Sequence, residues 1–299
     1  MDSVQNSALL DGRGSLPFLY RWAARRKLPG SSVSRHPSAP SKLEFSGRGR
    51  VGCLPVDATA RITVMASSFL TPNLLEEAHT AAEYLRWVQM LISRVKDEPD
   101  GLRQIRLRMG LAKELMNEAL PIGLLASTYF GGSDEVSIRL KIGSQSYDAI
   151  VSDRRSGTDS VQHVEVTLAG DGEDDYLRMR TLHETGEVSG LGRVAKSGTK
   201  RTGLKIHVES EMVSQPEILR RESSRVARAI ERKLGKTCPP NTLLLVGFDD
   251  TMAFDRPDNV ANLEATVAAF LPKLAAFHSV AIVGMQERLF LSWRTASAI

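Results

Sequence analysis

The chain has 299 residues, of which 42% are hydrophobic and 25% charged, a composition typical of soluble globular proteins. No apolar run reaches the roughly 20 residues that a membrane helix needs. Its only two cysteines, Cys53 and Cys238, exclude a disulfide framework and a cysteine-built zinc site, and predict a cytoplasmic setting. The net charge of +4 arises from residues 1–64, which hold ten basic and four acidic residues. Residues 65–299, the body of the chain, hold 29 basic and 31 acidic residues. The body is therefore not a generally basic nucleic-acid binder.

Residues 1–64 form a basic leader that is rich in Arg, Ser, Gly and Pro. The leader shows no sustained period of 3.6 or 2, so we predict that it is disordered and lies outside the fold. Three origins stay open for it: a mis-assigned start upstream of Met65, an organelle transit segment, or a flexible arm that touches nucleic acid.

Helical spacing begins after Met65. Apolar residues from Leu74 to Val95 predict an N-terminal helix within residues 65–100, ended by the "KDEPDG" stretch. A second helix is expected over 102–119, with Pro121 ending or kinking it. Residues 101–299 are expected to form one α/β domain.

Two period-2 strands follow, "VSIRLKI" and "YDAIVSD", which a tight Gly143–Ser144 turn is expected to join, and then a third strand, "HVEVTLAG". The "DGEDD" stretch predicts a helix start that runs on to His183. The later elements are a strand over 204–210, a helix over 218–235, a strand over 241–248, a helix over 259–277 and a closing strand pair over 279–285 and 288–293. This order predicts an α/β fold, a mixed β-sheet flanked by helices.

Two of these strands carry an acid within an apolar run. Alternation puts Glu165 and Thr167 on one face of the third strand, and Asp148 lies at the start of the second. If the two strands pair, Asp148 and Glu165 converge, and two close carboxylates repel unless a cation lies between them. One or two carboxylates with water and substrate phosphate are the usual ligands of Mg²⁺, so the pair predicts a Mg²⁺ (or Mn²⁺) site. The competing interpretation is a pair of solvated acids on an exposed sheet face.

The helix, the three-strand meander with Asp148 and "Glu165-Val166-Thr167", and the following helix and strand resemble the PD-(D/E)XK nuclease superfamily, over roughly residues 102–293. The resemblance implies a restriction-endonuclease-like fold and Mg²⁺-dependent hydrolysis of DNA phosphodiesters, with Asp148 and Glu165 as metal ligands. It also implies a third acid on the preceding helix, at Glu118 or, one turn earlier, Glu114.

One motif position departs from the family. Thr167 stands where the family has its catalytic lysine, and a threonine is neither a base nor a cation. Lys141 is the first candidate for a relocated lysine, and Lys196, Lys200 and Lys205 are the others. The alternative is a catalytically inactive module that binds nucleic acid or a protein partner; a third possibility is another fold in which the strand acids are incidental.

A Gly-rich basic stretch over 190–205 is predicted to be a loop that grips a DNA phosphate backbone, unless it is a solvated loop. Its cations are Arg193, Lys196, Lys200, Arg201 and Lys205. The helix over 218–235 also carries many arginines, but Glu222 and Glu231 offset them, and a charged helix face is usually solvated.

Overall fold

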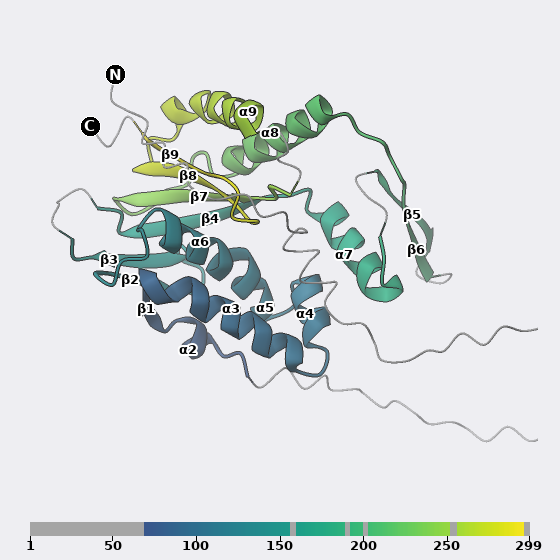
Figure 1. Ribbon diagram of the computed structural model, residues 1–299, viewed down its shortest axis with the longest axis horizontal. Coiled ribbons are helices and arrows are strands. Elements are labelled where there is room, and N and C mark those ends of the chain that lie inside the picture. Colours follow the sequence, from purple (N-terminus) through teal and green to yellow (C-terminus); the bar gives the residue numbers. More distant parts are fainter. Residues whose placement is uncertain (1–68, 156–159, 189–191, 200–202, 252–255, 296–299) are drawn as a thin grey trace, which may run out of the picture.

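A seven-stranded mixed sheet with helices on both faces forms the centre of the protein (Figure 1). The computed structural model describes residues 69–295 apart from 156–159, 189–191, 200–202 and 252–255. The predicted mixed sheet flanked by helices is confirmed. The predicted leader, residues 1–64, lies outside the described residues.

The predicted N-terminal helix is interrupted near its start. A short helix, α2 (Pro72–Leu75), is followed by a strand, β1 (Ala78–Thr80), and only then by the long helix α3 (Ala81–Asp97). The interruption follows from contacts with the next hairpin, because Glu76 O accepts a hydrogen bond from Arg139 Nε at 2.9 Å and β1 pairs antiparallel with β2. These contacts take the chain out of its helical path.

The second predicted helix consists of several pieces. After α4 (Gly101–Leu107), the chain forms α5 (Leu111–Glu114), a π-helical turn η1 (Leu115–Ala119) and α6 (Leu120–Thr128) without a break. The helix therefore does not end at Pro121. Proline lacks the N–H that an α-helix needs, and the wide π turn before it accommodates this loss.

The central strands follow the predicted order. An antiparallel meander of β2 (Val136–Leu140), β3 (Ala149–Asp153) and β4 (His163–Ala169) continues into β7 (Thr242–Phe248) and β8 (Ser279–Gly284), which run parallel to β4. β9 (Phe290–Arg294) closes the far edge, so the strand order is β1-β2-β3-β4-β7-β8-β9. The tight Gly143–Ser144 turn was a wrong prediction, because β2 and β3 are joined by the longer segment 141–148.

A long segment connects β4 to β7. It contains α7 (Glu173–Thr185), a separate hairpin of β5 (Val194–Thr199) and β6 (Gly203–Val208), and α8 (Gln215–Glu231). The described part of the predicted basic loop therefore lies mostly in a β-hairpin. α9 (Arg256–Ala268) and the short 3-10 helix η2 (Leu271–Lys273) follow β7.

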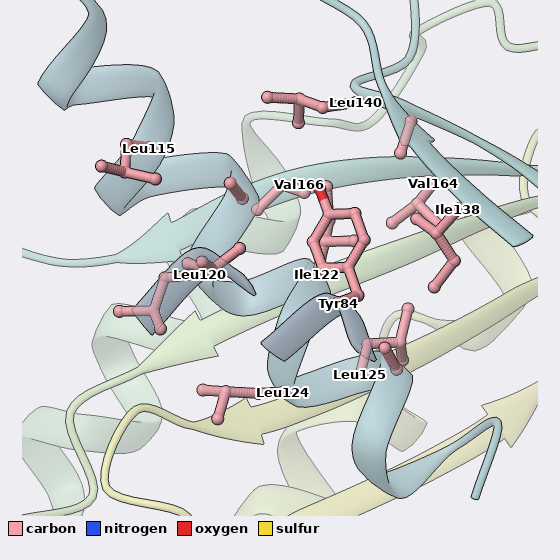
Figure 2. Packing of buried hydrophobic residues seen from close by; sticks show 14 of the residues in the cluster. Tyr84, Leu115, Leu120, Ile122, Leu124, Leu125, Ile138, Leu140, Val164 and Val166 are labelled. Atoms are coloured by element: carbon pink, nitrogen blue, oxygen red, sulfur yellow. The ribbon is translucent and has the colours of Figure 1, made fainter. Parts of the chain in front are cut away.

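The sheet divides the hydrophobic residues into two cores. α3 and α6 cover one face, where Tyr84 packs among aliphatic side chains from the helices and the meander (Figure 2). α8 and α9 cover the other face, with Val226, Leu263 and Phe277 at its centre. In the described part of the chain, no helix is long and apolar enough to cross a membrane.

Candidate active site

Two polar side chains of β4 lie on the face of the sheet that α8 and α9 cover. Glu165 is only 1% exposed and Thr167 is 7% exposed, while the alternate residues Val164 and Val166 fill the core on the opposite face. The predicted alternation of β4 is thus confirmed. A buried carboxylate is costly unless it is paired, so the partners of Glu165 decide what the site can do.

Asp148 bonds to β4 just beyond the end of the β3–β4 ladder. The β3–β4 ladder includes only the pairs Ala149↔Val164 and Ile150↔His163. Just beyond them, Asp148 N donates to Val164 O at 2.7 Å and Asp148 Oδ2 accepts from Val166 N at 2.6 Å. The side chain of Asp148 thus accepts a hydrogen bond from the backbone N–H of the residue next to Glu165, and the charge of Glu165 contributes to the raised pKa of Asp148, so the two acids are electrostatically coupled.

Two lysines that follow α8 bind Glu165. Lys233 Nζ and Lys236 Nζ both donate to Glu165 Oε1, the latter at 2.5 Å. The lysine side chains are 20% and 30% exposed, so each keeps some access to solvent. Glu165 Oε2 is buried and has no hydrogen-bond partner. One carboxylate oxygen is therefore doubly paired and the other is available to a ligand.

The chain path explains why these lysines arrive here. β4 and β7 are parallel neighbours, with His163 opposite Thr242, so the segment that leads into β7 must approach the beginning of β4. α8 therefore runs antiparallel to β4, as its contacts show: Arg228 binds Asp171, and Arg232 donates to Leu168 O. The residues just after α8 then meet Glu165.

The lysine predicted for the site, Lys141, lies elsewhere. Its Nζ donates to Glu76 Oε2 at 2.6 Å, and Ile142 N binds the other oxygen of Glu76. The hydrogen bond from Lys141 is the largest cause of the lowered pKa of Glu76. Lys141 is thus committed to joining β2 to the α2–β1 segment, and the prediction that it supplies the ammonium of the site is corrected.

The basic stretch over 193–205 also differs from its prediction. Lys196 forms an ion pair with Glu173 of α7, and Arg193 and Lys205 are exposed at the two strands of the hairpin. Lys200 and Arg201 lie outside the described residues. None of the described cations of this stretch contacts Glu165.

Glu118 lies on the π turn that packs against β4. The pKa of Glu118 is raised to about 7, chiefly by burial and then by the negative charges of Asp148, Glu114 and Glu165, while the charge of Lys113 opposes the rise. Glu114, one turn earlier, has a buried Oε2 without a partner. The predicted third acid is therefore electrostatically coupled to the other two.

Asp148 shows the same conflict between charges. Burial raises its pKa, and the charge of Glu165 adds to the effect, while the hydrogen bond from Val166 and the two lysines oppose it. A further positive charge among these carboxylates would relieve the repulsion.

Within the described ranges, no three His, Cys, Asp or Glu side chains gather closely enough to hold a metal ion. Two carboxylates, one of them with an unpartnered oxygen, still match the sparse protein ligation of Mg²⁺. No protein-family model, curated protein or solved structure matches this chain.

Proposed function

We propose that this protein hydrolyses phosphodiester bonds of DNA with a divalent metal ion, Mg²⁺ or Mn²⁺, held by Asp148 and Glu165. The observation that carries the proposal is the convergence of these two acids with Lys233 and Lys236. Two carboxylates and an ammonium group in one partly buried site are the groups that metal-assisted phosphoryl chemistry uses.

The strand order supports a restriction-endonuclease-like arrangement. A helix precedes the β2–β3–β4 meander, and β7 lies parallel beside β4 after the α8 crossover. Asp148 at the start of the second meander strand and Glu165 on the third occupy the positions that the resemblance assigns to the metal ligands.

The donor atoms also fit a metal ion. Glu165 Oε2 is buried and unpartnered. Burial is the largest cause of the raised pKa values of Asp148 and Glu118, and the charges of neighbouring carboxylates add to it. Asp148 and Glu165 would hold the ion directly, and Glu118 would act from a greater distance through its charge. When bound, the ion would activate a water molecule and neutralise charge on the scissile phosphate.

The lysines take the role that Thr167 cannot fill. An ammonium group beside Glu165 stabilises negative charge that develops on the phosphate oxygens and orients the attacking water. Since both lysines share Glu165 Oε1, one can remain on the carboxylate while the other turns toward the substrate. The buried Thr167 contributes only packing beside them.

A catalytically inactive binding module is the second candidate. The observation that favours it is again the lysine pair, because two ammonium groups already neutralise Glu165 and can replace a cation. In that case the protein would bind nucleic acid or a partner without cleaving DNA.

A cleavage assay on plasmid DNA with Mg²⁺ or Mn²⁺ tests the proposal. The unmutated protein should cleave, and Asp148→Asn and Glu165→Gln should abolish cleavage. Lys233→Met and Lys236→Met should each reduce it, at least one of them by roughly 10²-fold or more. Lys273→Met, on the exposed surface of η2, is the matched control and should leave cleavage unchanged. DNA binding without metal-dependent cleavage would support the binding module instead.

A further inference from the structure

A second charged site lies along the middle of α8. A cavity of about 380 Å³ opens between α7, the start of the β5–β6 hairpin and the part of α8 from Arg220 to Arg228, in the region where the hairpin stands away from the main sheet (Figure 1). Six guanidinium groups line it: Arg178, Arg193, Arg220, Arg221, Arg225 and Arg228.

The charge of this cavity is positive on balance. Its lining includes three carboxylates, those of Asp171, Asp174 and Glu211, against the six arginines. A fourth acid, Glu217, pairs with Arg220 and Arg221 from outside the lining. Even with that acid included, the cavity retains two positive charges in a body whose net charge is −2.

The arginines are held in place by the carboxylates. Arg225 Nε and Arg228 donate to the two oxygens of Asp171 at 2.6 and 2.7 Å, and Arg221 binds Glu211 at 3.1 Å. A guanidinium has five N–H donors, so these bonds leave donors for a further acceptor. The pairs fix the planar groups before a ligand arrives, and planar guanidinium groups match phosphate oxygens in a bidentate way.

The arginines also form a row that leads to the carboxylates. Residues 221, 225, 228 and 232 are spaced by four, three and four positions, which places them on one face of α8. The same row binds β4 and the residues just after it: Arg228 donates to Asp171, and Arg232 donates to Leu168 O. The row ends at Glu165, where Lys233 and Lys236 bind. The α8 residues of the cavity, from Arg220 to Arg228, precede Lys233 in the chain, so at 1.5 Å per residue they lie roughly 7–20 Å from it along the helix axis.

We propose that this cavity binds a backbone phosphate of the DNA whose phosphodiester bond lies at Asp148 and Glu165, so that α8 follows the strand between the two sites. This inference rests on the proposed function for the identity of the ligand. A separation of roughly 7–20 Å corresponds to roughly two to six base pairs at 3.4 Å each. An acidic peptide would satisfy the cavity alone, but it would not account for the row of cations that continues to the carboxylate pair.

The test measures binding without cleavage. A labelled duplex of roughly 20 base pairs is titrated in EDTA by fluorescence anisotropy over a series of salt concentrations. Arg193→Gln/Arg220→Gln removes two exposed guanidinium groups of the cavity, and Arg86→Gln/Arg94→Gln removes two exposed ones from α3, on the opposite face of the sheet. Each phosphate contact contributes about 0.9 to the slope of log K against log salt. The cavity variant should lower that slope by about 1, the contribution of the one phosphate that the cavity binds, and the α3 variant should leave it unchanged.

Two further measurements separate the cavity from the chemistry. Arg193→Lys/Arg220→Lys keeps the charges and should restore the salt slope, whereas Asp148→Asn should leave DNA binding as strong as before. Equal slopes for the cavity and α3 variants would overturn the proposal even if the protein cleaves DNA. Binding of polyglutamate, but not of DNA, with the same arginine dependence would overturn it as well. A cavity-dependent slope in a protein that never cleaves DNA would preserve the binding site and refute the proposed function instead.

Discussion

Removing both lysines from Glu165 should destabilise the protein far more than removing either one. Glu165 is 1% exposed, and its Oε1 accepts from Lys233 and Lys236. With one lysine left, the carboxylate keeps a charge-assisted hydrogen bond, so each single Lys→Met change should cost about 1 kcal/mol. With both gone, a buried charge has no partner, and the loss expected for a broken buried pair is about 3–5 kcal/mol; we take about 3 kcal/mol because the lysines are partly exposed.

The assay is urea unfolding of the two single variants and the double variant, followed by adding Glu165→Gln to the double variant. Glutamine has no charge to desolvate, so the triple variant should recover most of the lost free energy of unfolding. The coupling energy between the two lysines should be about 1 kcal/mol, above the roughly 0.3–0.5 kcal/mol within which independent sites add. The slopes against urea should stay equal, so that the midpoints report stability alone.

Additive losses for the two lysines, together with no recovery by Glu165→Gln, would refute the reasoning. Lys273→Met serves as the matched control, since that side chain lies on the exposed surface near the Phe270 ring. It should change the unfolding free energy by less than about 0.5 kcal/mol.

Three other outcomes are expected. Asp148→Asn should leave the metal-free protein as stable as before or more stable, because it removes a charge beside Glu165. Stabilisation of this variant by Mn²⁺ in a thermal melt should vanish. A melting temperature that still rises with Mn²⁺ would contradict the metal assignment. Glu118, whose pKa in the folded protein is about 7, takes up a proton on folding between pH 4.5 and 7, so its contribution lowers the stability as pH rises through that window. Glu118→Gln should therefore be more stable than the unmutated protein above pH 7 by about 1–2 kcal/mol after allowance for solvent screening, with no gain at pH 4. A constant difference across pH would reject this account. Gly284→Ala should cost about 3 kcal/mol in urea unfolding, because its Cβ would lie 1.9 Å from Oδ2 of the buried Asp250; an unchanged midpoint would show that Asp250 moves freely.

The parts of the fold that the sequence predicts are those set by local periodicity. Alternation in "HVEVTLAG" identifies β4 and correctly separates Val164 and Val166 from Glu165. The convergence of Asp148 with Glu165 is also predictable, because a meander pairs its neighbouring strands. The failures occur where distant contacts override local pattern, as at Glu76, whose hydrogen bonds to Arg139 and Ile142 interrupt the predicted N-terminal helix.

The lysines of the site illustrate a different limit. Lys233 lies within the predicted helix over 218–235, whose charged surface is most simply interpreted as solvated. The observed α8 ends at Glu231, and both lysines follow it in the connection to β7. Neither residue is close to Glu165 in sequence, being 68 and 71 positions away. The signal that locates them is topological: once β7 is parallel to β4, the segment entering β7 must lie beside the start of β4. Lys141 was the wrong prediction: it belongs to the neighbouring first strand of the meander, but its ammonium group binds Glu76, and the crossover through α8 determines which lysines reach the acids.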